Sequence, residues 1–236
     1  MAAPSDKVLR DTDVHIAERL RNCFERHDVL AMNFVGVPGA GKTCLIEETL
    51  ERLPEHESAH VLVADLATEM DMARLLAQGY PVSEITTDGS YRVTAKMVAR
   101  RICPECMHLE DGCSPSFDYL LVENVNCMCK TADLGETARV MVMSVVDGDD
   151  KPIKFGDAIA EADAVVWTQA DLIPHLSFDL ATARANARKY HPGIPMFVVS
   201  CTTGEGLGEW MEWIAERMAS VRSKEGHRSG RTRPVC

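Results

Sequence analysis

The chain has 236 residues, of which 46% are hydrophobic, and a formal net charge of −11 at pH 7. This size and apolar content suffice for one buried core, so we expect a single domain. The negative charge argues against a nucleic-acid partner, because phosphate backbones are bound by basic surfaces. No apolar run reaches the ~18–20 residues that cross a bilayer, and the N-terminus lacks a signal-peptide pattern. We therefore expect no membrane partner and a cytoplasmic location.

Short apolar runs alternate with segments of helical periodicity along most of the chain. This alternation is typical of an α/β fold, with a mostly parallel sheet covered by helices on both faces. The expected strands are residues 29–35, 60–64, 82–85, 118–123, 139–146, 164–168 and 196–200. The expected helices are residues 14–26, 42–53, 70–76, 94–102, 157–161, 179–190 and 207–218. Residues 1–28 form an N-terminal helical lead, 29–219 the domain, and 220–236 a basic tail that we expect to be disordered.

A phosphate-binding pattern lies between the first expected strand and the helix that follows it. The run Gly36-Val37-Pro38-Gly39-Ala40-Gly41-Lys42-Thr43 matches G-x-x-x-x-G-K-[ST], the P-loop. Glycines let the backbone bend so that its N–H groups converge on the α/β-phosphates. Lys42 would reach the β/γ-phosphates, Thr43 would offer a hydroxyl to Mg²⁺, and Cys44 continues the nucleotide-binding segment. The pattern predicts a nucleoside di- or triphosphate ligand and a P-loop NTPase three-layer sandwich.

Two carboxylates follow expected strands. Asp65 comes after Val61-Leu62-Val63-Ala64, and Glu123 ends the run from Asp118. Ligands of open parallel sheets bind beyond the carboxyl ends of the strands, and Mg²⁺ in phosphate sites is held by one or two carboxylates. Asp65 and Glu123 are therefore candidates to hold Mg²⁺ together with Thr43. The alternative is that both are solvated strand ends.

The nine cysteines suggest thiols or metal ligands rather than disulfides, since their number is odd and the expected compartment is reducing. Cys103 and Cys106 have the C-x₂-C spacing of a zinc knuckle, with His108 and Cys113 close behind. These four residues form either a structural zinc site or a loop of reduced cysteines.

Beyond the P-loop, the chain resembles the nickel-insertion GTPases of hydrogenase maturation, the HypB type, which are relatives of the urease-maturation GTPases. The resemblance covers residues 8–218. The matching runs are Met32-Asn33-Phe34, Asp65 to Asp71, Glu123-Asn124-Val125, Asp133-Leu134-Gly135-Glu136, Ser144 to Pro152 with its Gly148-Asp149-Asp150-Lys151-Pro152, Ala162-Asp163, Asp171-Leu172 and Ser200 to Gly206. The resemblance implies a G domain of the SIMIBI class and a GTP-controlled homodimer. Such a dimer passes Ni²⁺ toward a nickel-enzyme precursor, with other maturation proteins as partners.

The first departure from the family concerns the base. Members read guanine through Asn-Lys-x-Asp, whereas this chain has Thr168-Gln169-Ala170-Asp171. Asp171 keeps the acceptor for the guanine N–H groups, which adenine lacks, but the loss of Asn and Lys should weaken affinity. Ser200, Cys201 and Thr202 stand where backbone N–H groups contact the base carbonyl in the family. GTP remains the expected nucleotide.

The second departure concerns the transition metal. Members place Cys-His where this chain has Tyr91 and Arg92, and neither residue is a soft ligand for nickel or zinc. Cys127 and Cys129 lie in the loop after Glu123, near the position of a family cysteine. Two chains meeting at a dimer axis would bring four thiolates together around one Ni²⁺ or Zn²⁺ ion. The alternative is that Cys127 and Cys129 are free thiols.

The leading interpretation is a homodimeric metallochaperone GTPase in which Lys42, Asp65 and Glu123 act on GTP and Mg²⁺. No activating arginine is identifiable in cis, so hydrolysis should be slow. Asp65 is the candidate that orients the attacking water. The alternatives are a non-hydrolysing or altered-specificity metal-binding paralogue and a small-molecule kinase.

Overall fold

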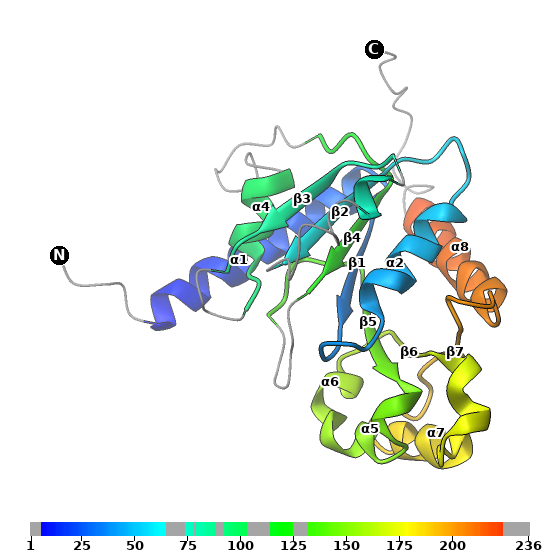
Figure 1. Ribbon diagram of the computed structural model, residues 1–236. Helices are drawn as coiled ribbons and strands as arrows, with labels where there is room; N and C mark the ends of the chain where they lie inside the picture. Colours follow the sequence, from blue (N-terminus) through cyan, green and yellow to red (C-terminus); the bar gives the residue numbers. More distant parts are fainter. Residues whose placement is uncertain are drawn as a thin grey trace.

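In the computed structural model, the described residues are 6–64, 74–77, 79–87, 92–102, 114–124 and 132–223. They contain a seven-stranded sheet in the order β3-β2-β4-β1-β5-β6-β7, in which every strand pairs with its neighbours in parallel (Figure 1). The strands are β1 Leu30–Val35, β2 Ala59–Ala64, β3 Val82–Ile85, β4 Tyr119–Glu123, β5 Ala138–Ser144, β6 Ala164–Thr168 and β7 Met196–Val198.

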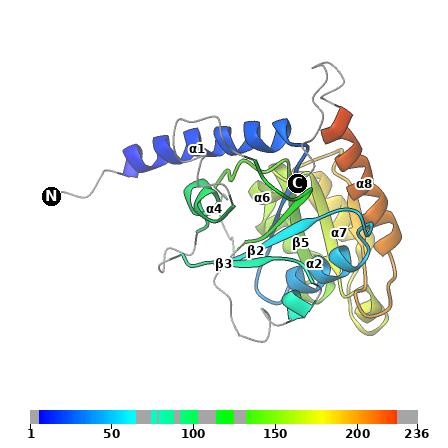
Figure 2. The same ribbon diagram turned by 90° about the horizontal axis from the view of Figure 1, so that it is seen from above.

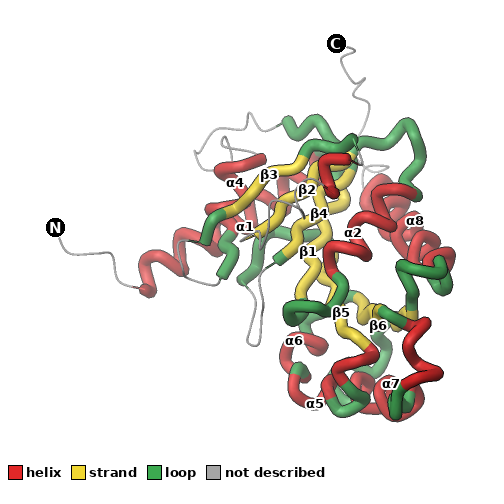
Figure 3. Tube along the Cα trace, in the orientation of Figure 1, coloured by secondary structure: helices red, strands yellow, loops and turns green. Residues whose placement is uncertain are grey.

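Helices cover both faces of this sheet, as Figure 3 shows with helices in red around yellow strands. The helices are α1 Asp6–Arg26, α2 Lys42–Glu51, α4 Ala95–Ile102, α5 Lys151–Lys154, α6 Gly156–Ala160, α7 Leu180–Arg188 and α8 Leu207–Ser223, and the 3₁₀-helices are η2 Val145–Asp147 and η3 Ala170–His175. Within the described ranges, none of these helices has both the length and the apolar character needed to cross a membrane.

Within the described residues, the core consists of three apolar clusters. One face of the sheet packs against α2 and α8, where Trp210 contacts Phe34 with ring centroids 6.2 Å apart. On the opposite face, α1 and α4 cover the β2–β4–β1 half, and α6 and α7 cover the β5–β6 half. Figure 2 shows α1 as a long helix along one side of the molecule, near α4. Burial on both faces explains why inner strands such as β1 and β6 read as mostly apolar runs rather than as alternating patterns.

All seven expected strands and the α/β fold class are confirmed. The prediction missed α5, η2 and η3, and α1 begins eight residues earlier than the expected Val14, at Asp6. Val145 and Val146, which were expected to end the strand 139–146, belong to η2. Helix α8 continues to Ser223, so residues 220–223 belong to a helix and not to the expected tail. Residues 224–236, like most of the helix expected at 70–76, lie outside the described residues.

Cys23 departs from the expectation for the cysteines. Cys23 lies on α1 with its side chain fully buried, and it is disulfide-bonded rather than a thiol. By contrast, Cys44 and Cys201 are free cysteines, as expected.

Candidate nucleotide-binding site

The P-loop connects the end of β1 to the start of α2, the geometry that the sequence pattern requires. Gly41 directly precedes α2 in the left-handed conformation, with φ of 80°. A Cβ atom at Gly36 would lie 2.3 Å from the Val142 carbonyl oxygen, and one at Gly41 would lie 3.0 Å from Thr168 Oγ1. Both glycines are therefore needed for the loop to approach β5 and β6.

The Lys42 ammonium is held inside this loop. Its Nζ donates to the carbonyl oxygens of Gly36 (3.1 Å) and Val37 (3.2 Å), and the residue is largely buried. Burial lowers the pKa of Lys42, against the opposing attraction of the Glu123 carboxylate. A cation with few water contacts beside the N-terminus of a helix is well placed to attract phosphate oxygens.

The structure brings Thr43 and Glu123 together, as the sequence predicted. Thr43 Oγ1 donates to the Glu123 carboxylate and lies 2.8 Å from Oε1 and 3.0 Å from Oε2. A hydroxyl and a carboxylate beside a phosphate-binding loop are the oxygen ligands that Mg²⁺ prefers, so this pair fits that ion. The third expected member, Asp65, lies outside the described residues.

The expected base-reading residues also converge. Asp171 lies in η3, and Ser200 Oγ donates to its Oδ1 at 2.5 Å. The backbone N–H of Thr203 in turn donates to Ser200 Oγ (3.1 Å). Asp171, Ser200 and the backbone of Thr203 thus form one hydrogen-bonded unit, and Cys201 and Thr202 lie between Ser200 and Thr203 in the sequence.

Sequence reasoning missed a connection between the base segment and the P-loop. Thr168 is buried, and its Oγ1 donates to the Ala40 carbonyl oxygen at 2.7 Å. The next residue, Gln169, adopts a left-handed conformation with φ of 61°, and its side-chain oxygen accepts a hydrogen bond from Ser144 Oγ. The segment that departs from the family pattern is therefore built into the site. The sequence did contain one signal for this contact, because Thr168 places a hydroxyl, which can donate a hydrogen bond, at the position of the family asparagine.

Two free cysteines flank the site. Burial, together with the nearby Cys44, raises the pKa of Cys201 to about 12, so this thiol is neutral at pH 7. Arg74 lies near Cys44 Sγ (3.7 Å) and pairs with Glu47 at 2.5 Å.

The residues expected to bind a transition metal are not among those described; these are Cys103, Cys106, His108, Cys113, Cys127 and Cys129. In the described ranges, no group of three or more His, Cys, Asp or Glu side chains is arranged to hold a metal ion.

Comparison with known proteins agrees with this geometry. Residues 30–198 match the model of the CobW/HypB/UreG nucleotide-binding domain. A hydrogenase maturation factor HypB from Azotobacter chroococcum mcd 1 is 38% identical over 220 residues, which are 92% of this chain and 70% of the relative. The chain belongs to the CobW/HypB/UreG family and is of the HypB type.

Solved HypB structures have the same fold. HypB from Archaeoglobus fulgidus is 27% identical, with a TM-score of 0.78 over 87% of this chain and 98% of its own. HypB from Helicobacter pylori, solved in complex with nickel, has a TM-score of 0.75 at 23% identity, over 94% of this chain and 99% of its own. The second likeness supports the fold alone.

In this HypB-type chain, the Thr168 hydroxyl should contribute to nucleotide affinity by fixing the P-loop relative to the base segment. Thr168→Val keeps the shape and removes the hydrogen bond to Ala40. One such bond is worth about 1 kcal/mol, so the Kd for GDP should rise about fivefold in calorimetry. Thr182→Val, which changes an exposed threonine on α7, should leave the Kd unchanged. Equal GDP affinity in the Thr168 and Thr182 variants would contradict this role.

Proposed function

We propose that the protein is a GTP-dependent metallochaperone that helps to insert nickel into a hydrogenase or a related metalloenzyme during maturation. The contact between Thr43 and Glu123, directly beside Lys42, carries the proposal, because it joins phosphate-binding and Mg²⁺-binding groups in a HypB-type chain. The relatives named as hydrogenase maturation factors support the same process.

In this function the protein is a slow GTPase. Lys42 and the P-loop N–H groups stabilise negative charge on the phosphates. Thr43, Asp65 and Glu123 would hold Mg²⁺ or its waters, and that ion would neutralise charge on the β- and γ-phosphate oxygens. Asp65 orients the attacking water. Without an arginine supplied to the phosphates, turnover stays low.

Asp171 selects guanine in this proposal. Ser200 holds one oxygen of its carboxylate, and ionised carboxylate oxygens keep further lone pairs for the N1–H and 2-amino groups of guanine. The backbone N–H groups of Ser200, Cys201 and Thr202 are the proposed contacts to the base carbonyl, next to the hydrogen bond between Ser200 and Asp171.

GDP should therefore compete better than ADP for the natural protein, and Asp171→Asn should reduce this preference. The amide replaces an acceptor with a donor that faces the donors of guanine. Competition with a fluorescent GDP analogue measures both affinities. Asp157→Asn, which removes an exposed carboxylate on α6, is the matched control. If ADP binds the natural protein as well as GDP does, the protein is not a guanine-specific switch.

We propose a homodimer as the metal-binding form. Tyr91 and Arg92 replace the family ligands, so Cys127 and Cys129 of two chains would supply four thiolates to one Ni²⁺ or Zn²⁺ ion. Their position in the sequence, shortly after Glu123, would couple the ion to the state of the nucleotide. Cys103, Cys106, His108 and Cys113 are proposed as a separate structural zinc site.

A stoichiometry tests this arrangement. In reducing buffer, with Cys103, Cys106 and Cys113 changed to serine, one Ni²⁺ should still bind per dimer, with an affinity that depends on GTP. Cys127→Ser with Cys129→Ser should abolish this binding, because two thiolates per chain are lost. Elemental analysis coupled to mass measurement gives the number of Ni²⁺ ions bound per dimer in each variant. One ion per monomer, or binding that survives the double change, would contradict the interfacial site.

The altered-specificity paralogue is the second candidate. Two observations favour it. Thr168-Gln169 replaces the Asn-Lys pair with which family members bind guanine, and Tyr91-Arg92 replaces their Cys-His metal ligands. Phosphate release from GTP, measured with and without candidate acceptors, separates the GTPase from this paralogue and from a kinase.

A further inference from the structure

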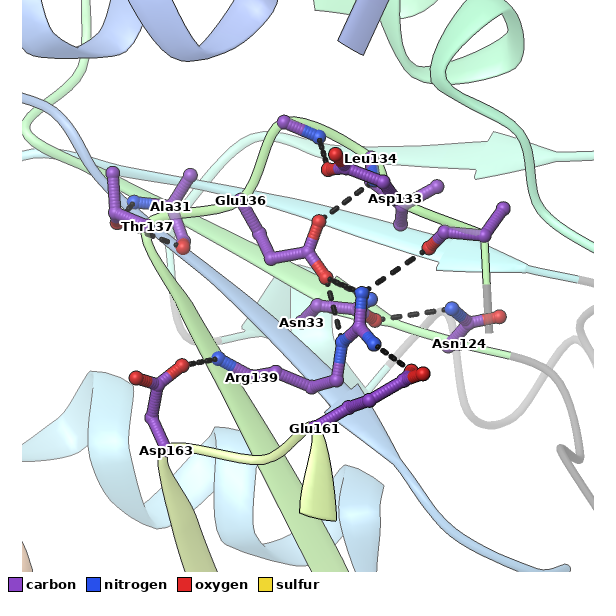
Figure 4. Close-up of polar contacts among 12 residues, drawn as sticks. Ala31, Asn33, Asn124, Asp133, Leu134, Glu136, Thr137, Arg139, Glu161 and Asp163 are labelled. Carbon is purple, nitrogen blue, oxygen red and sulfur yellow. Dashed lines mark hydrogen bonds and ion pairs between the residues drawn. The ribbon is translucent and has the colours of Figure 1, made fainter. Parts of the chain in front are cut away.

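A buried polar cluster crosses the sheet on the face covered by α1, α4, α6 and α7 (Figure 4). It comprises Asn33 on β1, Asn124 just after β4, Glu136 just before β5 and Arg139 on β5, and we call it the polar seam. Asn33 is completely buried and Asn124 is 5% exposed. The side chains of Glu136 and Arg139 are 7% and 11% exposed. The seam separates the apolar cluster under α1 and α4 from the one under α6 and α7.

Its hydrogen bonds form one continuous chain. Asn124 Nδ2 donates to Asn33 Oδ1 (3.0 Å), and Asn33 Nδ2 donates to Glu136 Oε1 (3.1 Å). The same glutamate oxygen accepts from Arg139 Nε (2.8 Å) and Nη2 (2.6 Å). Glu136 Oε2 accepts from the backbone N–H of Leu134 (2.7 Å). Asn124, the residue that follows β4, is thus connected by hydrogen bonds through Asn33 on β1 to Arg139 on β5.

The seam also contains residues from sequence runs that match the family but that do not themselves belong to the nucleotide site described above. These residues are Asn33, Asn124, Glu136 and Asp163, together with the backbone of Leu134. Asp163 takes part because its Oδ2 accepts from the backbone N–H of Arg139 (2.8 Å). Arg139 Nη2 also lies 3.4 Å from the Ala132 carbonyl oxygen, as a donor.

The seam reaches the nucleotide site through the end of β4. Glu123 and Asn124 are consecutive, and the alternation of side chains along a strand sends them to opposite faces of the sheet. Glu123 meets Thr43 on the face of α2, while Asn124 meets Asn33 on the other. The Asn124 backbone N–H also donates to the Phe34 carbonyl oxygen (3.0 Å). The two contacts of Asn124 with β1 therefore fix the backbone next to Glu123 from the face of the sheet opposite α2.

Stability alone does not require these polar groups. Leucine has the same branching at Cγ as asparagine, although its methyl groups make it larger, and replacing both partners of a buried hydrogen bond by apolar groups of similar shape is often neutral or stabilising. An amide, unlike leucine, fixes orientation, because one atom must donate and another accept. Mg²⁺ demands oxygens at well-defined distances of about 2.0–2.1 Å, so orientation matters at Glu123.

We propose that the polar seam is a positioning device for Glu123, in which Asn33 and Asn124 hold the end of β4 so that the carboxylate meets Thr43 and the Mg²⁺ of a bound nucleotide. Asn33 and Asn124 are positioning residues and do not touch the nucleotide. The inference rests on the proposed function, because it takes Mg²⁺ and a guanine nucleotide as the ligands.

The test is the double variant Asn33→Leu with Asn124→Leu, which removes both partners of one hydrogen bond and leaves Glu136 paired with Arg139. The readout is the Mg²⁺ concentration that half-maximally slows release of a fluorescent GDP analogue. Loss of groups that orient metal ligands typically weakens metal affinity 10- to 100-fold, so this concentration should rise about tenfold or more. The affinity for the analogue in EDTA, which reports on the P-loop and the base segment, should not change.

Tyr119→Phe is the matched control, because it removes a buried hydrogen bond from the other end of the same strand. Tyr119 donates to Glu57 Oε2 (2.6 Å), and Glu57 keeps its second partner, Arg222 (2.8 Å). This control should lower the thermal midpoint without altering the Mg²⁺ requirement. If the double variant does not fold, Asn124→Ala should raise the requirement in the same direction.

An unchanged Mg²⁺ requirement in a folded seam variant would overturn the positioning role and leave the proposed function intact. A similar rise in Tyr119→Phe would also overturn it, because the effect would then follow stability. If the natural protein releases GDP equally fast with and without Mg²⁺, both the positioning role and the proposed function are wrong.

Discussion

The hydrogen bond between Thr43 and Glu123 is the contact on which the site depends, since it joins residues 80 positions apart in the sequence. It requires β4 to lie beside β1, so that the strand ending in Glu123 runs next to the strand that leads into the P-loop. It also requires Gly36 and Gly41, which let the loop approach β5 and β6. The strand order of the sheet thus places a carboxylate beside the first turn of α2, where the phosphates of a nucleotide would bind.

Much of the fold could be predicted because buried parallel strands have a strong local signal. Ala164–Thr168 is a continuous apolar run and has the predicted bounds. Two elements were not predictable from local pattern. The first turns of α1 carry few apolar residues, and η3 contains Pro174 and follows Gln169, a non-glycine residue with positive φ. A left-handed glutamine is set by its surroundings, here Ser144, and not by its own preference.

The candidate site was predictable where chemistry follows a fixed spacing, as in the P-loop, or the end of a strand, as at Glu123. It was not predictable where the partner is distant in the sequence. In the sequence, Thr168 appeared only as the loss of the asparagine that family members use to bind the base. In the structure, its hydroxyl donates a hydrogen bond to the carbonyl oxygen of Ala40, 128 positions away. Asn33 and Glu136 likewise match the family pattern without a role that the sequence explains. The pairing of β1 with β5 brings the two side chains into hydrogen-bonding contact. Departures and matches in a family pattern therefore need the fold before they acquire a physical meaning.

The central claim is that this chain binds the phosphates of a guanine nucleotide in its P-loop, and equilibrium titration of Lys42→Ala with GTP tests it most directly. The change removes the buried cation and leaves the glycine geometry in place. Losing charged hydrogen bonds of this kind costs about 3 kcal/mol, so affinity should fall on the order of a hundredfold while circular dichroism stays unchanged. Lys154→Ala, which removes an exposed lysine from α5, should bind GTP normally. Undiminished GTP binding by folded Lys42→Ala protein would contradict the account.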